Sequence, residues 1–200
     1  MLDKSVPFHT IIMKRPYEKA PVPIALQTGY KIRAYEPGDE VGWAEIETEV
    51  LEFDSVEQSL NCHQGYIPRI NDLKKRQWFV ESPQGILIAT ATAWCDETPQ
   101  GKIPVVHALS CRPEYQGNGF GRAVAIKMLE SFYDLDMDLD VWLDTQTWSY
   151  KTVELYLSLG FVPMKKAVFN GAQNEYDKAL PIFKEHMRRE SYQKFVETSI

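Results

Sequence analysis

The sequence predicts an α+β fold in a single domain, with a mixed central β-sheet flanked by helices. The chain has 200 residues and is 44% hydrophobic, which is enough for one globular core, and no shift in composition marks a second domain. Residues 77–81 and 86–95 are rich in β-branched and aromatic side chains and are joined by a Ser-Pro-Gln-Gly turn, which predicts an antiparallel hairpin. Residues 103–111 form a further apolar strand that leads through a glycine-rich turn into an amphipathic helix.

The first third of the chain predicts strands joined by a connector. Residues 10–13 form a short strand, and the prolines that follow, up to residue 29, are typical of a connecting segment. Residues 30–35 alternate as a second strand.

Two short helices are expected next. Asp39 follows a Pro-Gly turn and is placed to cap a helix that runs to about residue 51. Ser55 and Gln58 have the spacing of a capping box, which predicts a second helix that ends near Gly65.

The second half of the chain alternates helices and strands after the hairpin. The apolar spacing predicts a helix after the glycines up to residue 132, a strand at 141–144, a helix at 153–159 and a strand at 161–168. Beyond Asn170 and Gly171, residues 174–194 predict a helix. We therefore divide the chain into an N-terminal strand and connector (1–29), a main domain (30–168) and a C-terminal helical extension packed on that domain (169–200).

The glycine-rich turn is the strongest indication of function. Gly117, Gly119 and Gly121 stand between an apolar strand and a helix, where glycine lets the backbone turn tightly and approach a ligand closely. The free N–H groups of the new helix then point at whatever lies above its first turn, and an anion is favoured there.

The residues around the glycines exclude two common types of phosphate-binding loop. No Gly-Lys-Ser/Thr follows them, so a Walker-type loop is excluded, and Arg122 stands where a dinucleotide fingerprint needs glycine. The remaining pattern, Gln116-x-x-Gly119-x-Gly121 followed by Arg122, resembles the pyrophosphate loop of the Gcn5-related N-acetyltransferases (GNAT), which hold coenzyme A. Residues 155–161, LYLSLGF, are similar to a second motif of that family, and the resemblance covers residues 30–168.

The resemblance implies acetyl-CoA as co-substrate, with no metal. Its pyrophosphate would lie on the loop, pantetheine would bond the hydroxyl of Ser149, and a backbone N–H at or near Leu109 would stabilise the oxyanion. The residues that it places at the cofactor are Leu109, Ser110, Cys111, Gln116, Gly117, Asn118, Gly119, Phe120, Gly121, Arg122 and Ser149. Cys111 has no adjacent basic activator, which favours a buried thiol over a nucleophile.

His107 is the first candidate for a general base. The stretch His107 to Cys111, HALSC, resembles the HALAV segment of the arylalkylamine acetyltransferases, in which the histidine takes part in proton removal. The companion histidine of that segment is Val105 here, so a two-histidine relay is not implied. A role for His107 as an ordinary sheet residue stays open.

Glu47 is the second candidate for the base. The inward stripe of its helix is defined by Trp43, Ile46, Val50 and Leu51. Glu47 occupies a place within this stripe where an apolar residue is expected. It either serves a site or reaches water at the edge of the stripe. Glu45 and Glu49 fall on the outer faces and are expected to be solvated.

Tyr156 is the candidate general acid. It matches the family's tyrosine that lies near the sulfur of the cofactor, and a phenol there would protonate the departing thiolate. The alternative is a packing tyrosine on an amphipathic helix. Four aromatic residues are expected to belong mainly to the core, with one or two lining an acceptor pocket: Trp43, Phe53, Tyr66 and Trp94.

The composition of the chain limits the kinds of partner that it is expected to bind. A formal charge of −6 argues against nucleic-acid binding and favours a cationic small molecule. The chain lacks a signal-length or membrane-length apolar run, and its three cysteines have neither disulfide nor zinc spacing, so we expect a cytoplasmic protein without membrane contact. A homodimer stays open.

The predicted activity is transfer of an acetyl group from acetyl-CoA to a primary amine of a small molecule by direct attack. Two alternatives stay open, an acetyltransferase that modifies proteins or peptides and a non-catalytic acyl-CoA-binding regulatory module. The identity of the acceptor amine is left open, as is the choice between His107 and Glu47.

Overall fold

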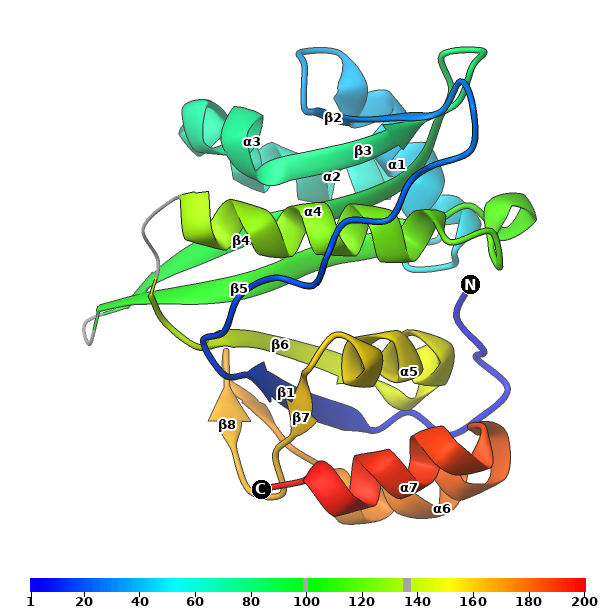
Figure 1. The fold of residues 1–200 in the computed structure, drawn as a ribbon, viewed down its shortest axis with the longest axis vertical. Helices are drawn as coiled ribbons and strands as arrows, with labels where there is room; N and C mark the ends of the chain where they lie inside the picture. Colours follow the sequence, from blue (N-terminus) through cyan, green and yellow to red (C-terminus); the bar gives the residue numbers. More distant parts are fainter. Residues whose placement is uncertain (99–100, 135–137) are drawn as a thin grey trace. The chain divides into compact units, whose positions relative to one another are not determined.

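The computed structural model describes residues 1–98, 101–134 and 138–200. Their contacts divide the chain into two compact units (Figure 1). The first unit holds Lys19–Asp138 together with Met1, and the second holds Leu2–Glu18 and Leu139–Ile200. The α+β class predicted from the sequence is confirmed.

The first unit is built on an antiparallel sheet. Its strands pair in the order β2 (Lys31–Ala34), β3 (Gln77–Glu81), β4 (Leu87–Thr98) and β5 (Gly101–Cys111). The β3–β4 hairpin and the strands on either side of it were all predicted from the sequence.

Helices cover both faces of this sheet. Helix α4 (Phe120–Asp134) packs on one face, against β3 and β4, while α1 (Asp39–Glu49), α2 (Val56–His63) and α3 (Ile70–Arg76) lie on the other (Figure 1). The core beneath α1 and α3 consists of large apolar side chains, namely Tyr35, Trp43, Ile46, Leu73, Phe79, Leu87 and Trp94.

In the second unit, strand β1 lies between two antiparallel neighbours. Strand β1 (Thr10–Arg15) pairs with β6 (Val141–Gln146) along its whole length and with β7 (Val162–Pro163) at two positions. The remaining elements of this unit are α5 (Tyr150–Ser158), β8 (Val168–Phe169), β9 (Ala172–Gln173), α6 (Tyr176–His186) and α7 (Arg189–Thr198).

The predicted cap of α1 is wrong. The N-cap residue is Gly38, with φ 106°, and no side chain caps the helix. The carboxylate of Asp39 instead receives both terminal nitrogens of Arg33, at 2.6 and 2.7 Å, and the N–H of Glu36 at 2.6 Å. A charge-assisted bidentate pair is stronger than a neutral capping bond, so the arginine takes the carboxylate.

The capping box of α2 is confirmed, but the helical region continues further than predicted. The N–H of Gln58 donates to Oγ of Ser55 at 3.2 Å. After α2, a 3₁₀ turn over residues 64–69 leads into α3, which the sequence analysis did not identify. Gly65 and Pro68 interrupt the apolar spacing there.

The C-terminal region also differs from its prediction. The strand expected at 161–168 shortens to the two residues of β7. Asn170 and Gly171 both have positive φ, 49° and 75°, and close the small β8–β9 hairpin, as in a type I′ turn.

The helix predicted at 174–194 is broken into α6 and α7 by two residues with extended ψ, Met187 and Arg188. The Arg188 backbone N–H and side chain are both held by Glu154 of α5, at 2.7 and 2.6 Å. Phe183 and Phe195 pack edge to face across the break, with ring centroids 4.9 Å apart.

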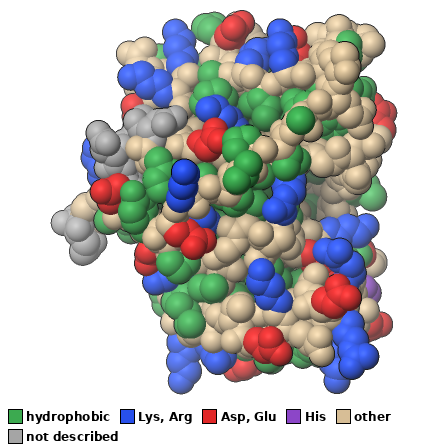
Figure 2. Space-filling model, in the orientation of Figure 1, with side chains coloured by type: hydrophobic (Ala, Val, Ile, Leu, Met, Phe, Trp, Pro, Cys, Tyr) green, Lys and Arg blue, Asp and Glu red, His purple; other side chains and the backbone are tan. Residues whose placement is uncertain are grey.

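Within the described ranges, no helix is both long and apolar enough to cross a bilayer. In the view of Figure 2, Lys and Arg side chains are interspersed with Asp and Glu.

Candidate active site

The glycine-rich turn joins β5 to α4 with two left-handed residues. Gly117 and Gly119 have φ values of 81° and 85°, a region that side chains other than glycine rarely adopt. A Cβ at Gly119 would lie 3.7 Å from Cδ1 of Ile24, which is ordinary contact, so the backbone angle is what requires glycine. The N–H of Ala123 donates to the carbonyl of Gly119 at 2.9 Å, and the N–H groups before it, from the start of α4 at Phe120, have no carbonyl to bond within the helix. That of Gly121 hydrogen-bonds the Cys111 thiol, and an anion is favoured above this turn.

The polar side chains of the loop hold its own backbone. Nε2 of Gln116 donates to the carbonyl of Cys111 at 2.9 Å, and Nδ2 of Asn118 donates to Tyr115 and Gln116 carbonyls at 3.2 Å. The side chain of Phe120 is buried against Tyr30, so only its backbone faces a ligand. The loop residues predicted at the cofactor, Gln116 to Arg122, therefore form one contiguous turn.

A β-bulge precedes the loop. Thr92 of β4 is opposite His107, and Thr90 is opposite Ser110, so two residues of β5, Ala108 and Leu109, face a single residue of β4. Ala108 adopts a left-handed conformation with φ 50°. A bulge disrupts the regular ladder, which is the backbone irregularity that a donor at Leu109 requires. No glycine marks this bulge, so the sequence carries no signal for it.

Glu47 is buried, with 2% of its surface exposed. The alternative that it reaches water is therefore wrong. Burial raises the pKa of this carboxyl to about 8, although a hydrogen bond from the Ser110 side chain acts in the opposite direction. Its Oε1 atom has no hydrogen-bond partner among the described residues. A carboxyl with this pKa can both hold and release a proton near neutral pH.

Aromatic side chains surround this part of α1. Trp43, one helical turn before Glu47, is buried, and its indole N–H also lacks a partner in the described part of the chain. The Trp43 ring contacts His63 at 5.0 Å and Tyr66 at 6.4 Å between centroids, and Tyr66 in turn packs edge to face on Trp94 at 4.9 Å. These aromatic residues belong to the core, as predicted, and they also lie around Glu47, the candidate base.

His107 is joined to this aromatic group. Its Nδ1 lies 3.1 Å from the hydroxyl oxygen of Tyr66, and its ring stacks on Trp94 with centroids 6.2 Å apart. Burial raises the pKa of Tyr66, so that the side chain stays a neutral phenol. The sequence predicts Tyr66 among four aromatics that belong mainly to the core, with one or two lining an acceptor pocket, and the separation of 41 positions from His107 hides their contact.

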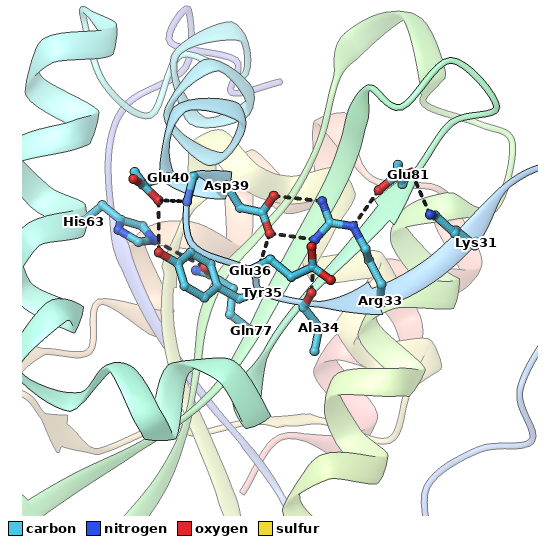
Figure 3. A network of polar contacts seen from close by, with 11 residues as sticks. Lys31, Arg33, Ala34, Tyr35, Glu36, Asp39, Glu40, His63, Gln77 and Glu81 are labelled. Atoms are coloured by element: carbon cyan, nitrogen blue, oxygen red, sulfur yellow. Dashed lines mark hydrogen bonds and ion pairs between the residues drawn. The ribbon is translucent and has the colours of Figure 1, made fainter.

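A second histidine lies in the same group. His63 is fully buried, and its Nε2 is 3.3 Å from Oε1 of Gln77, as Figure 3 shows. Burial lowers the pKa of His63 and favours the neutral ring. The sequence gives no signal for His63, because it occupies an ordinary position in an amphipathic helix.

Cys111 and two glutamates complete this region. Burial raises the pKa of the Cys111 thiol to about 11, which agrees with an unreactive thiol rather than a nucleophile. Glu45 and Glu49, predicted to be solvated, also bind Arg112. Both carboxylates stay 46% and 42% exposed, as expected for outer faces, and their contact with Arg112 was not predicted because the partner is more than sixty residues away in the sequence.

Tyr156 and Ser149 belong to the second unit. Tyr156 lies on α5, is 6% exposed, and packs on Phe161 with centroids 5.3 Å apart. Ser149 precedes the first residue of α5, and its side chain makes no capping bond. The loop, Glu47 and His107 all belong to the first unit. Over the described residues, no cluster of His, Cys, Asp and Glu has the makeup of a metal site.

Comparison with known proteins agrees with this geometry. The family described as acetyltransferase (GNAT) matches residues 41–161. A mycothiol acetyltransferase of Thermobispora bispora is 30% identical in an alignment of 165 positions that covers 74% of this chain and 52% of that protein. The chain thus spans about half the length of this curated relative.

Solved structures share the fold. A GCN5-related N-acetyltransferase from Sphaerobacter thermophilus has a TM-score of 0.61 at 19% identity, covering 79% of this chain and 49% of its own. An acetyltransferase from Clostridium acetobutylicum solved with acetyl-CoA has a TM-score of 0.52 at 14% identity, covering 66% and 88%.

Proposed function

Because the chain belongs to the GNAT acetyltransferase family, we propose that it transfers the acetyl group of acetyl-CoA to a primary amine of a small molecule. The observation that carries the proposal is the turn at Gly117 and Gly119, whose left-handed backbone leads directly into the first turn of α4. The free N–H groups there, with Arg122 on the same turn, fit the pyrophosphate of coenzyme A. The Clostridium acetobutylicum structure, which holds acetyl-CoA, supports the same co-substrate.

The chemistry is direct attack. The amine nitrogen forms a bond to the thioester carbonyl carbon, the C–S bond breaks, and the thiolate leaves with a proton. An alkyl amine has a pKa near ~10, so only about one molecule in a thousand is nucleophilic at pH 7, and a base must accept its proton.

Glu47 and His107 are the two groups of the first unit that are suited to accept this proton. The pKa of about 8 gives Glu47 more affinity for a proton than an ordinary carboxylate has. His107 has a neutral phenol on its Nδ1 side. We assign the departing thiolate's proton to Tyr156, by its match to the family's motif.

The surroundings of Glu47 favour a cationic amine with an apolar body. A buried carboxylate with an unpartnered oxygen suits an ammonium group, and the rings of Trp43, Tyr66 and Trp94 suit an apolar remainder. The net charge of −6 agrees with a cationic acceptor. The relative named for mycothiol supports a small molecule over a protein acceptor.

The test combines binding and turnover. Calorimetry should detect coenzyme A binding, and incubation with acetyl-CoA and a panel of primary amines should release free thiol and yield acetylated amine by mass spectrometry. Coenzyme A at 100 times its dissociation constant should stabilise the fold by ~2.7 kcal/mol in a thermal scan. Absence of coenzyme A binding would contradict the proposal.

The alternatives predict other results. Acetylation of peptides but of no free amine would indicate a protein acetyltransferase. Binding of acetyl-CoA without transfer to either class of acceptor would indicate a regulatory module.

A further inference from the structure

Arg112 occupies the junction between β5 and the glycine-rich loop. It is 8% exposed, and both its backbone and its side chain are fixed to the beginning of β4. Its N–H donates to the carbonyl of Ile88 at 2.8 Å, and its Nε donates to the carbonyl of Leu87 at 2.7 Å. These two hydrogen bonds fix the orientation of the guanidinium group. Its two terminal nitrogens are left to bind other partners.

Those remaining nitrogens bind two carboxylates of α1. One terminal nitrogen of Arg112 donates to Oε2 of Glu45 at 2.6 Å, and the other donates to Oε1 of Glu49. The two glutamates are one helical turn apart, and Glu47 lies between them in the sequence. Two residues before Arg112, the Ser110 side chain hydrogen-bonds Glu47 itself.

We propose that Arg112 is a positioning residue, which holds α1, and with it the carboxylate of Glu47, at a fixed place relative to the cofactor loop. This inference rests on the proposed function. The loop begins at the residue after Arg112, so one rigid arginine connects the segment that binds the co-substrate with the helix that carries the candidate base. Displacement of a reacting group by about 1 Å can cost on the order of 10²-fold in rate, so such a connection matters more for turnover than for stability.

Arg33 is a second arginine that binds α1, so its role can be compared with that of Arg112. Arg33 binds Asp39, the first residue of α1, through two hydrogen bonds and also pairs with Glu81 at 2.5 Å, which ties the start of α1 to β2 and β3 (Figure 3). Both arginines anchor α1 through carboxylates. Only Arg112 adjoins the loop.

The ion pairs of Arg112 and those of Arg33 should contribute differently to the stability of the protein. The Glu45 and Glu49 side chains are 46% and 42% exposed, and ion pairs with so exposed a partner contribute little to stability. The Asp39 and Glu81 side chains are only 11% and 14% exposed. Loss of the Arg33 anchor should therefore destabilise the protein at least as much as loss of the Arg112 anchor.

Kinetics of two matched variants test the proposal. Arg112→Gln should lower kcat/KM for the best amine of the panel by roughly 10- to 100-fold, while the dissociation constant of coenzyme A changes less than about 3-fold. Arg33→Gln should lower Tm but leave kcat/KM for the amine within about 3-fold. Arg112→Lys keeps the charge without the planar fork and should fall between wild type and Arg112→Gln.

Hydrogen exchange gives a readout that needs only coenzyme A. In the wild type, coenzyme A should slow exchange both in the loop, residues 113–123, and in α1, residues 39–49. In Arg112→Gln the slowing should persist in the loop and disappear from α1, whereas Arg33→Gln should keep both. If Arg112→Gln does not fold, the double variant Glu45→Ala with Glu49→Ala removes both acceptors of Arg112 from half-exposed positions.

Two results would overturn the inference alone: protection of α1 that survives in Arg112→Gln or in the double alanine variant, and a loss of kcat/KM for the amine that is equally large in Arg33→Gln. Absence of loop protection in the wild type would instead overturn the proposed function, and this inference with it.

Discussion

The hydroxyl oxygen of Tyr66 lies 3.1 Å from Nδ1 of His107, which joins the 3₁₀ turn after α2 to the bulged end of β5. This ring nitrogen contacts a neutral phenol, so the imidazole has a hydrogen-bond partner that holds it in place. When the ring is protonated, Nδ1 donates to the phenol oxygen, so Tyr66 orients the ring and stabilises its charged form.

Substitution at this pair tests the role of His107. His107→Ala should lower kcat/KM for the amine by about 10²-fold and remove one ionisation from the acidic limb of its pH profile. Tyr66→Phe should give a smaller loss, about 10-fold, with the affinity for acetyl-CoA retained. A profile that His107→Ala leaves unchanged would assign the base to Glu47.

Glu47→Gln tests the buried carboxyl through stability. Folding raises the pKa of Glu47 from 4.5 to about 8, so the folded protein binds this proton more tightly than the unfolded chain. Stability is therefore complete below pH ~4.5, falls as the pH rises toward ~8, and is constant above that. Glu47→Gln should remove this loss of stability at high pH, because the glutamine side chain does not ionise.

The expected result is a crossover in thermal scans. At pH 9, Glu47→Gln should melt about 10 °C above the wild type, and at pH 5 the two should differ by only a few degrees. Glu57→Gln, at an exposed position on α2, is the control and should show no such difference. Equal melting of Glu47→Gln and wild type at pH 9 would show that the carboxyl is not buried as described.

Gly119→Val tests the loop. A β-branched residue cannot adopt φ 85° without strain, and its side chain would project into the cradle, so coenzyme A binding should be abolished in calorimetry. Gly85, with φ 81° in the β3–β4 turn, is a matched position, because Gly85→Val imposes similar strain outside the loop. Equal affinity in the two folded variants would argue against the assignment of the loop.

Tyr156→Phe tests the general acid. Turnover should fall roughly 10²-fold while the affinity for acetyl-CoA stays nearly intact, because only the transition state needs the phenol proton. Tyr150→Phe, on the same helix and hydrogen-bonded to Asp3, should leave turnover unchanged. Unaltered turnover in Tyr156→Phe, where chemistry limits the rate, would leave this tyrosine a packing residue.

Local patterns in the sequence predicted most of the fold. The hairpin, the glycine-rich loop and the capping box of α2 each depend on neighbouring residues, and each was correctly predicted. The cap of α1 was not, because the carboxylate of Asp39 is taken by Arg33, whose own position is fixed by Glu81 on another strand. The break between α6 and α7 likewise depends on a distant residue, Glu154.

In the candidate site, too, some residues were predicted from the sequence and others were not. Glu47 was identified because a charged residue interrupts an apolar stripe, and burial confirms that this departure is real. The contacts of Tyr66 and Arg112 were missed because each joins segments more than forty residues apart. Nothing within either segment distinguishes these residues from an ordinary core aromatic or a strand-terminal cation.

The left-handed Ala108 sets an asymmetric limit on how this strand can be engineered. Glycine adopts φ 50° freely, so Ala108→Gly relieves strain of about 1 kcal/mol, whereas valine or isoleucine, the residues that a consensus β-strand would favour, add to it. A randomised library at this position should therefore be enriched in glycine and asparagine after selection for folding. A design that straightens the strand would move its last residues by one position relative to β4 and turn Ser110 away from Glu47.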